Sequence, residues 1–135
     1  MKVADYVLQR LASEGIDTAF LVYGGAMAEM ADALARQTRI RYVVCQHEQA
    51  ACFASEGYAK ASGKPGLVIV KSGTGVGNIV TGLQNAFYDS APLIAISGLG
   101  ATNLIRPKGS PLRQLGFQET PAAEIARPIT KYAVT

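Results

Sequence analysis

Residues 42–51 read YVVCQHEQAA, and they join a short apolar run to the start of a helical pattern. The apolar run at 42–45 is typical of a buried strand, and the pattern from His47 to Ser62 is typical of a helix. Glu48 is therefore expected where a strand ends and a helix begins. In an open α/β sheet, ligands bind in the crevice at the carboxyl ends of the strands. Glu48 is thus a candidate ligand-binding acid, although an acid in this position also stabilises the positive end of a helix dipole.

The rest of the chain alternates between the same two patterns. Strand-like apolar runs occur at 18–22, 40–45, 67–70 and 92–97, and helical patterns at 3–11, 27–34, 47–62 and 78–88. This alternation predicts an α/β fold, a doubly wound parallel sheet with helices on both faces. Residues 98–116 predict a long irregular loop of the kind that is usually functional or mobile. Residues 128–135 resemble the beginning of another strand, so we expect one domain, residues 1–135, that is truncated at its C-terminal end.

Composition narrows the classes of protein to which the chain can belong. It has 135 residues, of which 49% are hydrophobic and 17% charged, which suits one domain with a buried sheet. The net charge of +3 is small and dispersed, so it does not predict nucleic-acid binding. No apolar run approaches the ~20 residues that a membrane helix needs. The N-terminus lacks the pattern of a signal peptide, and we expect a cytoplasmic protein that does not contact a membrane.

The residues that most often bind metals are few. Cys45 and Cys52 are the only cysteines, and we expect two buried free thiols. His47 is the only histidine. Because these residues do not follow any metal-binding spacing, the sequence predicts no metal site within the chain.

Glycine-rich segments follow three of the predicted strands, at residues 24–25, 73–77 and 98–100. Glycine allows a backbone to approach a ligand closely, so these segments are expected to form the rim of one pocket at one edge of the sheet. Each of them alone is equally compatible with a tight turn. Residues 73–77 read GTGVG, which differs from the GxGxxG pattern of dinucleotide-binding folds, and no phosphate-binding GxxxxGK[ST] pattern occurs.

Several motifs occur together in an order that is specific to one family. They are Gly24-Gly25-Ala26, HEQAA at 47–51, EGYAKASG at 56–63, SGTG at 72–75, Asn78, Thr81-Gly82, DSAP at 89–92, ISG at 96–98 and FQE at 117–119. In this order they resemble the N-terminal, pyrimidine-binding domain of thiamine diphosphate-dependent enzymes, and in particular the acetolactate synthase-like branch. The resemblance covers nearly the whole chain.

The resemblance implies that Glu48 is the catalytic residue. In this family, the glutamate of the HEQ-like motif contacts N1′ of the aminopyrimidine ring of the cofactor. We expect an apolar, dry surrounding to raise the pKa of Glu48, so that its carboxyl group shares a proton with N1′. The ring then favours its imino form, whose nitrogen can take the proton from C2 of the thiazolium ring. The cofactor performs the carbanion chemistry, and the protein supplies orientation and electrostatics.

The resemblance also assigns residues around the cofactor. The cofactor-binding set comprises Gly24, Gly25, Glu48, Gly73, Thr74 and Asn78. Phe117 and Gln118, in the long loop, are expected to reach the reacting centre of a neighbouring subunit on the substrate side. Core packing for Phe117 and a helix start for Gln118 are the alternatives. Cys52 follows Glu48 by one helical turn, where an inert packing thiol is the alternative to a position near the cofactor.

The resemblance implies the cofactor, the substrate and the partners. Thiamine diphosphate is the expected cofactor, with Mg²⁺ bound by a domain absent from this chain. A small 2-oxo acid is the expected substrate of a decarboxylase or carboligase, and a second subunit or downstream domain completes the site in a homodimer or homotetramer. The isolated chain should be inactive.

Departures from the family pattern affect the finer predictions. Leu21, Tyr23, Thr74 and Leu99 replace residues that the family often has, which argues against flavin adenine dinucleotide (FAD) as a second cofactor and against a fixed preference for pyruvate. The basic loop residues Arg106, Lys108 and Arg113 could attract an anionic acceptor, or could simply be solvated. The alternative function is a standalone nucleotide-binding or partner-subunit module without catalysis of its own.

Overall fold

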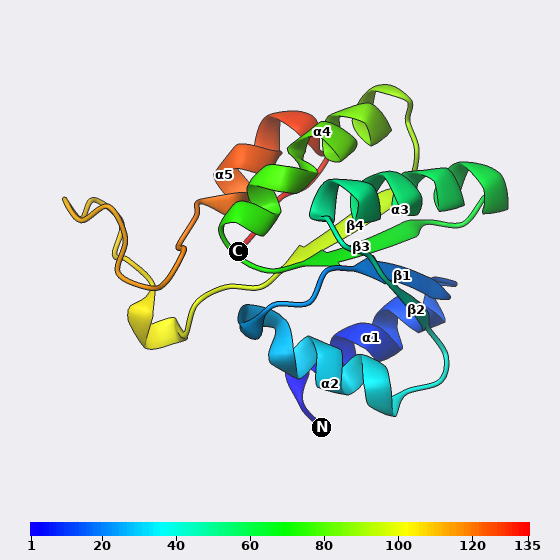
Figure 1. Cartoon of the computed structure of the whole chain (residues 1–135), viewed down its shortest axis with the longest axis horizontal. Helices are drawn as coiled ribbons and strands as arrows, with labels where there is room; N and C mark the ends of the chain where they lie inside the picture. The colour runs from blue at the N-terminus through cyan, green and yellow to red at the C-terminus, as the bar shows by residue number, and fades with distance from the viewer.

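A four-stranded parallel sheet with helices on both faces carries the fold in the computed structural model, which describes residues 1–135 (Figure 1). The strands are β1 (Thr18–Leu21), β2 (Arg41–Val44), β3 (Gly66–Val70) and β4 (Leu93–Ser97). The helices are α1 (Val3–Ser13), α2 (Ala28–Arg36), α3 (Glu48–Ser62), α4 (Thr74–Tyr88) and α5 (Ala122–Ala126). Short 3₁₀ turns are η1 (Gly25–Met27), η2 (Thr102–Leu104) and η3 (Arg127–Ile129). The predicted α/β fold is confirmed.

The order of the strands places a crevice at the centre of the sheet. The order is β2-β1-β3-β4, and every neighbouring pair is parallel. The chain leaves β1 toward β2 on one side and then crosses back to β3 on the other side. The carboxyl ends of β1 and β3 therefore form the topological switch point, where ligands bind in open α/β sheets.

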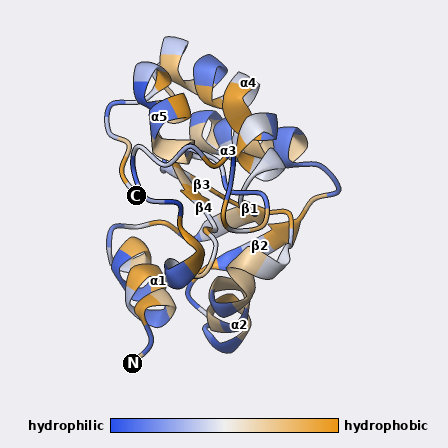
Figure 2. Cartoon of the chain, turned by 90° about the vertical axis from the view of Figure 1, so that its left-hand side faces the viewer, coloured by the Kyte–Doolittle hydropathy of each residue, from blue (hydrophilic) through white to orange (hydrophobic).

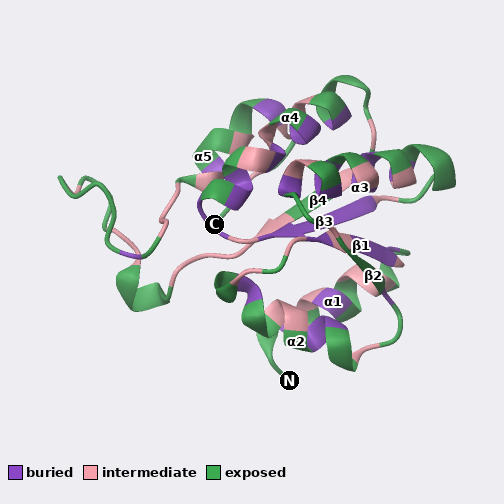
Figure 3. Ribbon diagram, in the orientation of Figure 1, coloured by how far each residue is buried: buried purple, intermediate pink, exposed green.

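Two layers of core lie on the two faces of the sheet. Along β3, Leu67 and Ile69 pack into the cluster formed with α1 and α2, whereas Val68 and Val70 pack with α3 and α4. All five residues of β3 are buried, as its continuous apolar run predicts (Figure 3). Hydrophobic and hydrophilic residues alternate along α1 and α4, as expected of helices with one face on the core (Figure 2). Each fully buried aliphatic side chain contributes ~1.5–3 kcal/mol to stability.

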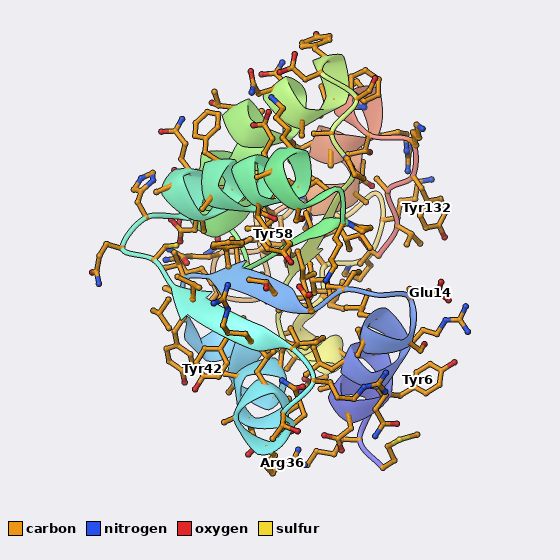
Figure 4. The ribbon with its side chains drawn as sticks, turned by 90° about the vertical axis from the view of Figure 1, so that its right-hand side faces the viewer. Tyr6, Glu14, Arg36, Tyr42, Tyr58 and Tyr132 are labelled. Atoms are coloured by element: carbon orange, nitrogen blue, oxygen red, sulfur yellow. The ribbon has the colours of Figure 1, made fainter.

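The strands at the two edges of the sheet are more exposed than the sequence predicts. All four residues of β2 are exposed, and Tyr42 lies on its outer side (Figure 4). Residues of β4 are exposed or half-buried. The prediction of buried strands at these two places is wrong because each has only one neighbour, and an apolar run does not reveal how many neighbours a strand has.

Two boundaries also differ from the predictions. The helix expected from Asn78 begins at Thr74, because Gly73 adopts a positive φ of 67° and turns the chain directly into α4. Most of the expected glycine loop is therefore the first turn of a helix. Residues 128–135 contain no strand: η3 extends to Ile129, which packs into the core beside α4, and residues 130–135 have no regular structure. The short helix α5 is absent from the predictions. None of the helices combines the length and the apolar character needed to cross a bilayer.

One polar cluster ties the helical layer to the start of the sheet. The Asp17 carboxylate, just before β1, accepts hydrogen bonds from Tyr58 of α3, from Nζ of Lys64 at 2.5 Å and from Oγ1 of Thr18 at 3.1 Å. Figure 4 shows Tyr58 between α3 and the strands. The hydrogen bond from the Lys64 ammonium is the largest of the influences that lower the pKa of Asp17 to about 2.

Candidate functional site

Glu48 is fixed at the first position of α3. His47 adopts an extended conformation as the N-cap, and its Nδ1 accepts a hydrogen bond from the backbone N–H of Gln49 at 3.2 Å. Glu48 is only 5% exposed. The predicted position of this acid, at a helix start beyond the carboxyl end of a strand, is confirmed.

Asn78 contacts Glu48 directly across the two helices. Its Nδ2 donates a hydrogen bond to Oε2 of Glu48 at 2.8 Å. The helices approach closely at Gly82, which has no side chain: a Cβ added there would lie 2.6 Å from Sγ of Cys52. The glycine thus allows α3 and α4 to approach closely enough for the Asn78 amide to reach the Glu48 carboxylate.

The charge state of Glu48 differs from the expected one. Burial raises its pKa, but the hydrogen bond from Asn78, a bond from its own backbone N–H and the positive charge of Lys71 together outweigh burial. The pKa is therefore lowered, and the expectation of a raised pKa is wrong for the chain alone. Glu48 is ionised near neutral pH and can accept a hydrogen bond or a proton.

A pocket of about 520 Å³ lies at the switch point of the sheet. Its walls include Gly24 and Gly25 after β1, Ser72 after β3 and Gly100 after β4. The glycine-rich segments at 24–25 and 98–100 thus line one pocket, as predicted from their positions after the strands. None of residues 73–77 lines it, so the prediction is wrong for the third segment, most of which is the first turn of α4.

The segment from residue 98 to 121 closes one side of this pocket. Phe117 and Gln118 line it, and a Cβ added at Gly73 would lie 2.5 Å from the carbonyl oxygen of Gln118. Phe117 is 81% exposed, so it does not pack in the core. Gln118 has a φ of 52° and precedes α5, so it does not begin a helix.

The predicted site residues fall into two adjoining groups. Gly24, Gly25, Phe117 and Gln118 line the pocket, whereas the buried Glu48 and the half-buried Asn78 form a hydrogen-bonded pair beside it. Gly73 joins the groups through its contact with Gln118. Thr74 is exposed at the start of α4 and is in neither group.

Lys71 belongs to the site and was missed in the sequence. It follows β3, lines the pocket and lowers the pKa of Glu48 through its charge. A Cβ added at Gly75 would lie 2.9 Å from Cγ of Lys71 and 3.4 Å from Oε1 of Glu48, which places Lys71 between the two groups. The sequence feature that could have identified Lys71 is its position directly after the most apolar strand, at the edge of the sheet where ligands bind.

The cysteines have no partner in this site. Both are free; Cys52 is fully buried, and burial raises its pKa to about 12. This supports the inert packing thiol rather than a reactive group. Cys45 is half-buried, so the prediction of two buried thiols is confirmed for Cys52 only.

Comparisons with known proteins point to one family. The sequence model of the family described as "Thiamine pyrophosphate enzyme, N-terminal TPP binding domain" matches residues 1–125. The chain is 45% identical over 134 residues to "Acetolactate synthase, chloroplastic" of Arabidopsis thaliana, covering 97% of the chain and 18% of the relative. It is 39% identical over 130 residues to "Acetolactate synthase large subunit" of Haemophilus influenzae, covering 96% and 22%. The chain spans about a fifth of the length of the curated relatives it matches.

Proposed function

The chain belongs to the N-terminal TPP-binding domain family of thiamine pyrophosphate enzymes, and we propose that it forms the pyrimidine-binding half of an acetolactate synthase-like active site. The complete protein then decarboxylates a 2-oxo acid and joins the product to an acceptor. The observation that carries this proposal is the hydrogen bond from Asn78 to the buried Glu48 beside a pocket at the switch point of the sheet.

The chemistry of Glu48 suits the aminopyrimidine ring of thiamine diphosphate. Asn78 donates a hydrogen bond to Oε2 of the carboxylate, and a Cβ added at Gly75 would lie 3.4 Å from Oε1, so the glycine places no side chain of its own against that oxygen. An ionised carboxylate with one oxygen available can accept a hydrogen bond from a ring nitrogen such as N1′. No Cβ contact within 4 Å would arise at Gly25, which leaves room for a planar ring on the pocket side.

Glu48 holds and moves the proton at N1′ in this proposal. When bound, thiamine diphosphate supplies a carbanion at C2 that adds to the carbonyl carbon of a 2-oxo acid. Glu48 is ionised in the chain alone, and a ring stacked over it would remove its remaining water. Desolvation raises the pKa of a carboxyl group, so the proton would be shared more evenly between Glu48 and the ring.

The remaining half of the site is proposed to come from elsewhere. The chain contains no group of three or more His, Cys, Asp or Glu side chains that could hold a metal ion. We therefore assign Mg²⁺ and the diphosphate to another domain, supplied by a second subunit of a homodimer or homotetramer. A cytoplasmic location stays a prediction.

The test uses the complete polypeptide that contains this chain. Glu48→Gln keeps the size of the side chain and its contact with Asn78 but cannot take a proton. We expect exchange of the C2 proton of bound thiamine diphosphate, measured by NMR, to slow by about 10²–10⁴-fold, and pyruvate turnover to fall with it. The control is Glu14→Gln at the exposed end of α1, which should leave both rates unchanged.

Two results would contradict the proposal. Unchanged C2 exchange in the Glu48→Gln protein would remove the role assigned to Glu48. Tight nucleotide binding by residues 1–135 alone, without Mg²⁺ and without a second subunit, would favour the standalone nucleotide-binding module instead.

A further inference from the structure

The pocket contains one charged side chain, that of Lys71. Its other walls are small, apolar or neutral polar residues. None of the ion pairs in the chain includes Lys71, so its ammonium has no carboxylate within 4.0 Å. An unpaired cation in a largely apolar pocket favours the binding of an anion, because its charge is weakly screened there.

Two glycines hold the stem of Lys71 in place. A Cβ added at Gly24 would lie 2.6 Å from Cβ of Lys71, and one added at Gly75 would lie 2.9 Å from its Cγ. The stem is therefore enclosed between the segments that follow β1 and β3. Holding the stem reduces the entropy that the side chain loses when it binds a ligand.

The neighbouring carboxylate does not satisfy Lys71. The positive charge of Lys71 lowers the pKa of Glu48, but the two groups do not form an ion pair. Oε2 of Glu48 accepts its hydrogen bond from Asn78 instead. The basic loop residues are poor competitors for an anion in this pocket. Arg106, Lys108 and Arg113 do not line it, and the Arg106 guanidinium donates to the carbonyl oxygen of Leu112 at 2.7 Å.

We propose that Lys71 binds the carboxylate of the 2-oxo acid substrate. This assignment rests on the proposed function, and it adds the group that selects an anionic donor over a neutral one. Ser72 and Gln118 line the same pocket and supply further polar groups there. The reacting carbonyl group of the substrate would then lie between Lys71 and the ring held at Glu48.

The binding test uses the complete polypeptide without thiamine diphosphate or Mg²⁺. The probe is radiolabelled oxamate, an unreactive anionic analogue of pyruvate, measured by equilibrium dialysis. Lys71→Met keeps an unbranched stem and removes the charge, so we expect oxamate to bind about tenfold more weakly, which corresponds to about 1.4 kcal/mol. The Kd of the Lys71→Arg protein for oxamate should stay within about threefold of the native value, because arginine keeps the positive charge. Lys131 is exposed and distant in sequence, so the Lys131→Met protein should bind oxamate as the native protein does.

A neutral analogue separates charge from shape. Pyruvamide should bind the native protein and the Lys71→Met protein equally, because its amide has no charge to lose. A thermal unfolding midpoint close to that of the native protein would show that the variant is folded.

The outcomes distinguish this inference from the proposed function. If Lys71→Met binds oxamate as well as the native protein does, or if the native protein does not bind oxamate, Lys71 is not the carboxylate site. Loss of C2 exchange in Glu48→Gln would still support the thiamine chemistry in that case. If oxamate binding depends on Lys71 but C2 exchange is unchanged in the Glu48→Gln protein, the pocket binds carboxylates and the proposed function is wrong.

Discussion

At the scale of single residues, the hydrogen bond from Asn78 lowers the pKa of Glu48. It is one of the influences that hold the pKa of Glu48 below its usual range against the effect of burial. Asn78→Ala removes this bond and leaves burial less opposed, so we expect the pKa of Glu48 to rise. NMR titration of a ¹³C-labelled Glu48 carboxyl group measures it.

The chain offers a matched control for this prediction. Asn85 donates a hydrogen bond to the buried Glu56 at 2.7 Å, across the same two helices and two turns further along. Asn85→Ala should leave the titration of Glu48 unchanged. A shift of equal size in both variants would mean that general loosening of the helix pair, rather than the Asn78 bond, sets the pKa.

Residue by residue, the sequence reveals part of this site. Glu48 can be predicted because its strand, its N-cap and its helix are contiguous. Asn78 can be placed on the same rim only through the family resemblance. The place of Lys71 directly after β3 marks it as a candidate, but the packing of its stem cannot be predicted from local sequence, because it depends on Gly24, which follows a different strand. The pKa of Glu48 is missed for the same reason, since the groups that lower it come from α4 and the end of β3.

At the scale of elements, the seam between α3 and α4 aligns the site. Gly82→Ala would place a Cβ 2.6 Å from Sγ of Cys52 and 2.8 Å from its Cβ. Overpacking of this kind costs about 1–3 kcal/mol. We expect a lower thermal unfolding midpoint and a longer distance from Asn78 to Glu48, and therefore weaker cofactor activation in the complete enzyme.

Gly77→Ala is the control on the same helix. It lies in α4 with nothing within 4 Å of an added Cβ, and alanine favours the helix by about 0.5–1 kcal/mol. This variant should be as stable as the native protein or more so. Equal loss of stability in both variants would show that any methyl group added to α4 destabilises the chain, so that the contact with Cys52 does not explain the effect at Gly82.

The elements themselves are predictable in type, and their surroundings are less so. The continuous apolar run of β3 identifies a central strand, and all five of its residues are buried. The similar runs of β2 and β4 suggest the same, but these strands form the edges of the sheet. The start of α4 cannot be predicted from the sequence, because Gly75 and Gly77 are poor helix formers and tertiary packing overrides this low propensity.

At the scale of the whole molecule, the Asp17 cluster joins the helical layer to the sheet and should make stability depend on pH. The pKa of Asp17 is about 2 in the folded chain, mainly through the hydrogen bond from Lys64, and an unfolded aspartate titrates near ~3.9. A depressed pKa means that the stabilisation is present above about pH 4 and is lost as the pH falls toward 2. The effect should be modest, because the Asp17 side chain is 39% exposed and solvent screens it.

Asp17→Asn isolates this contribution. The asparagine cannot titrate, so the variant should be less stable than the native protein at pH 7, and the difference should shrink between about pH 4 and pH 2. Lys64→Met removes the largest influence on Asp17 and should reduce the same pH dependence. Urea unfolding followed across this pH range measures both effects. Parallel curves for the native and Asp17→Asn proteins would mean that the link from α3 to β1 depends on packing, such as that of Tyr58 against Phe20, rather than on the Asp17 charge.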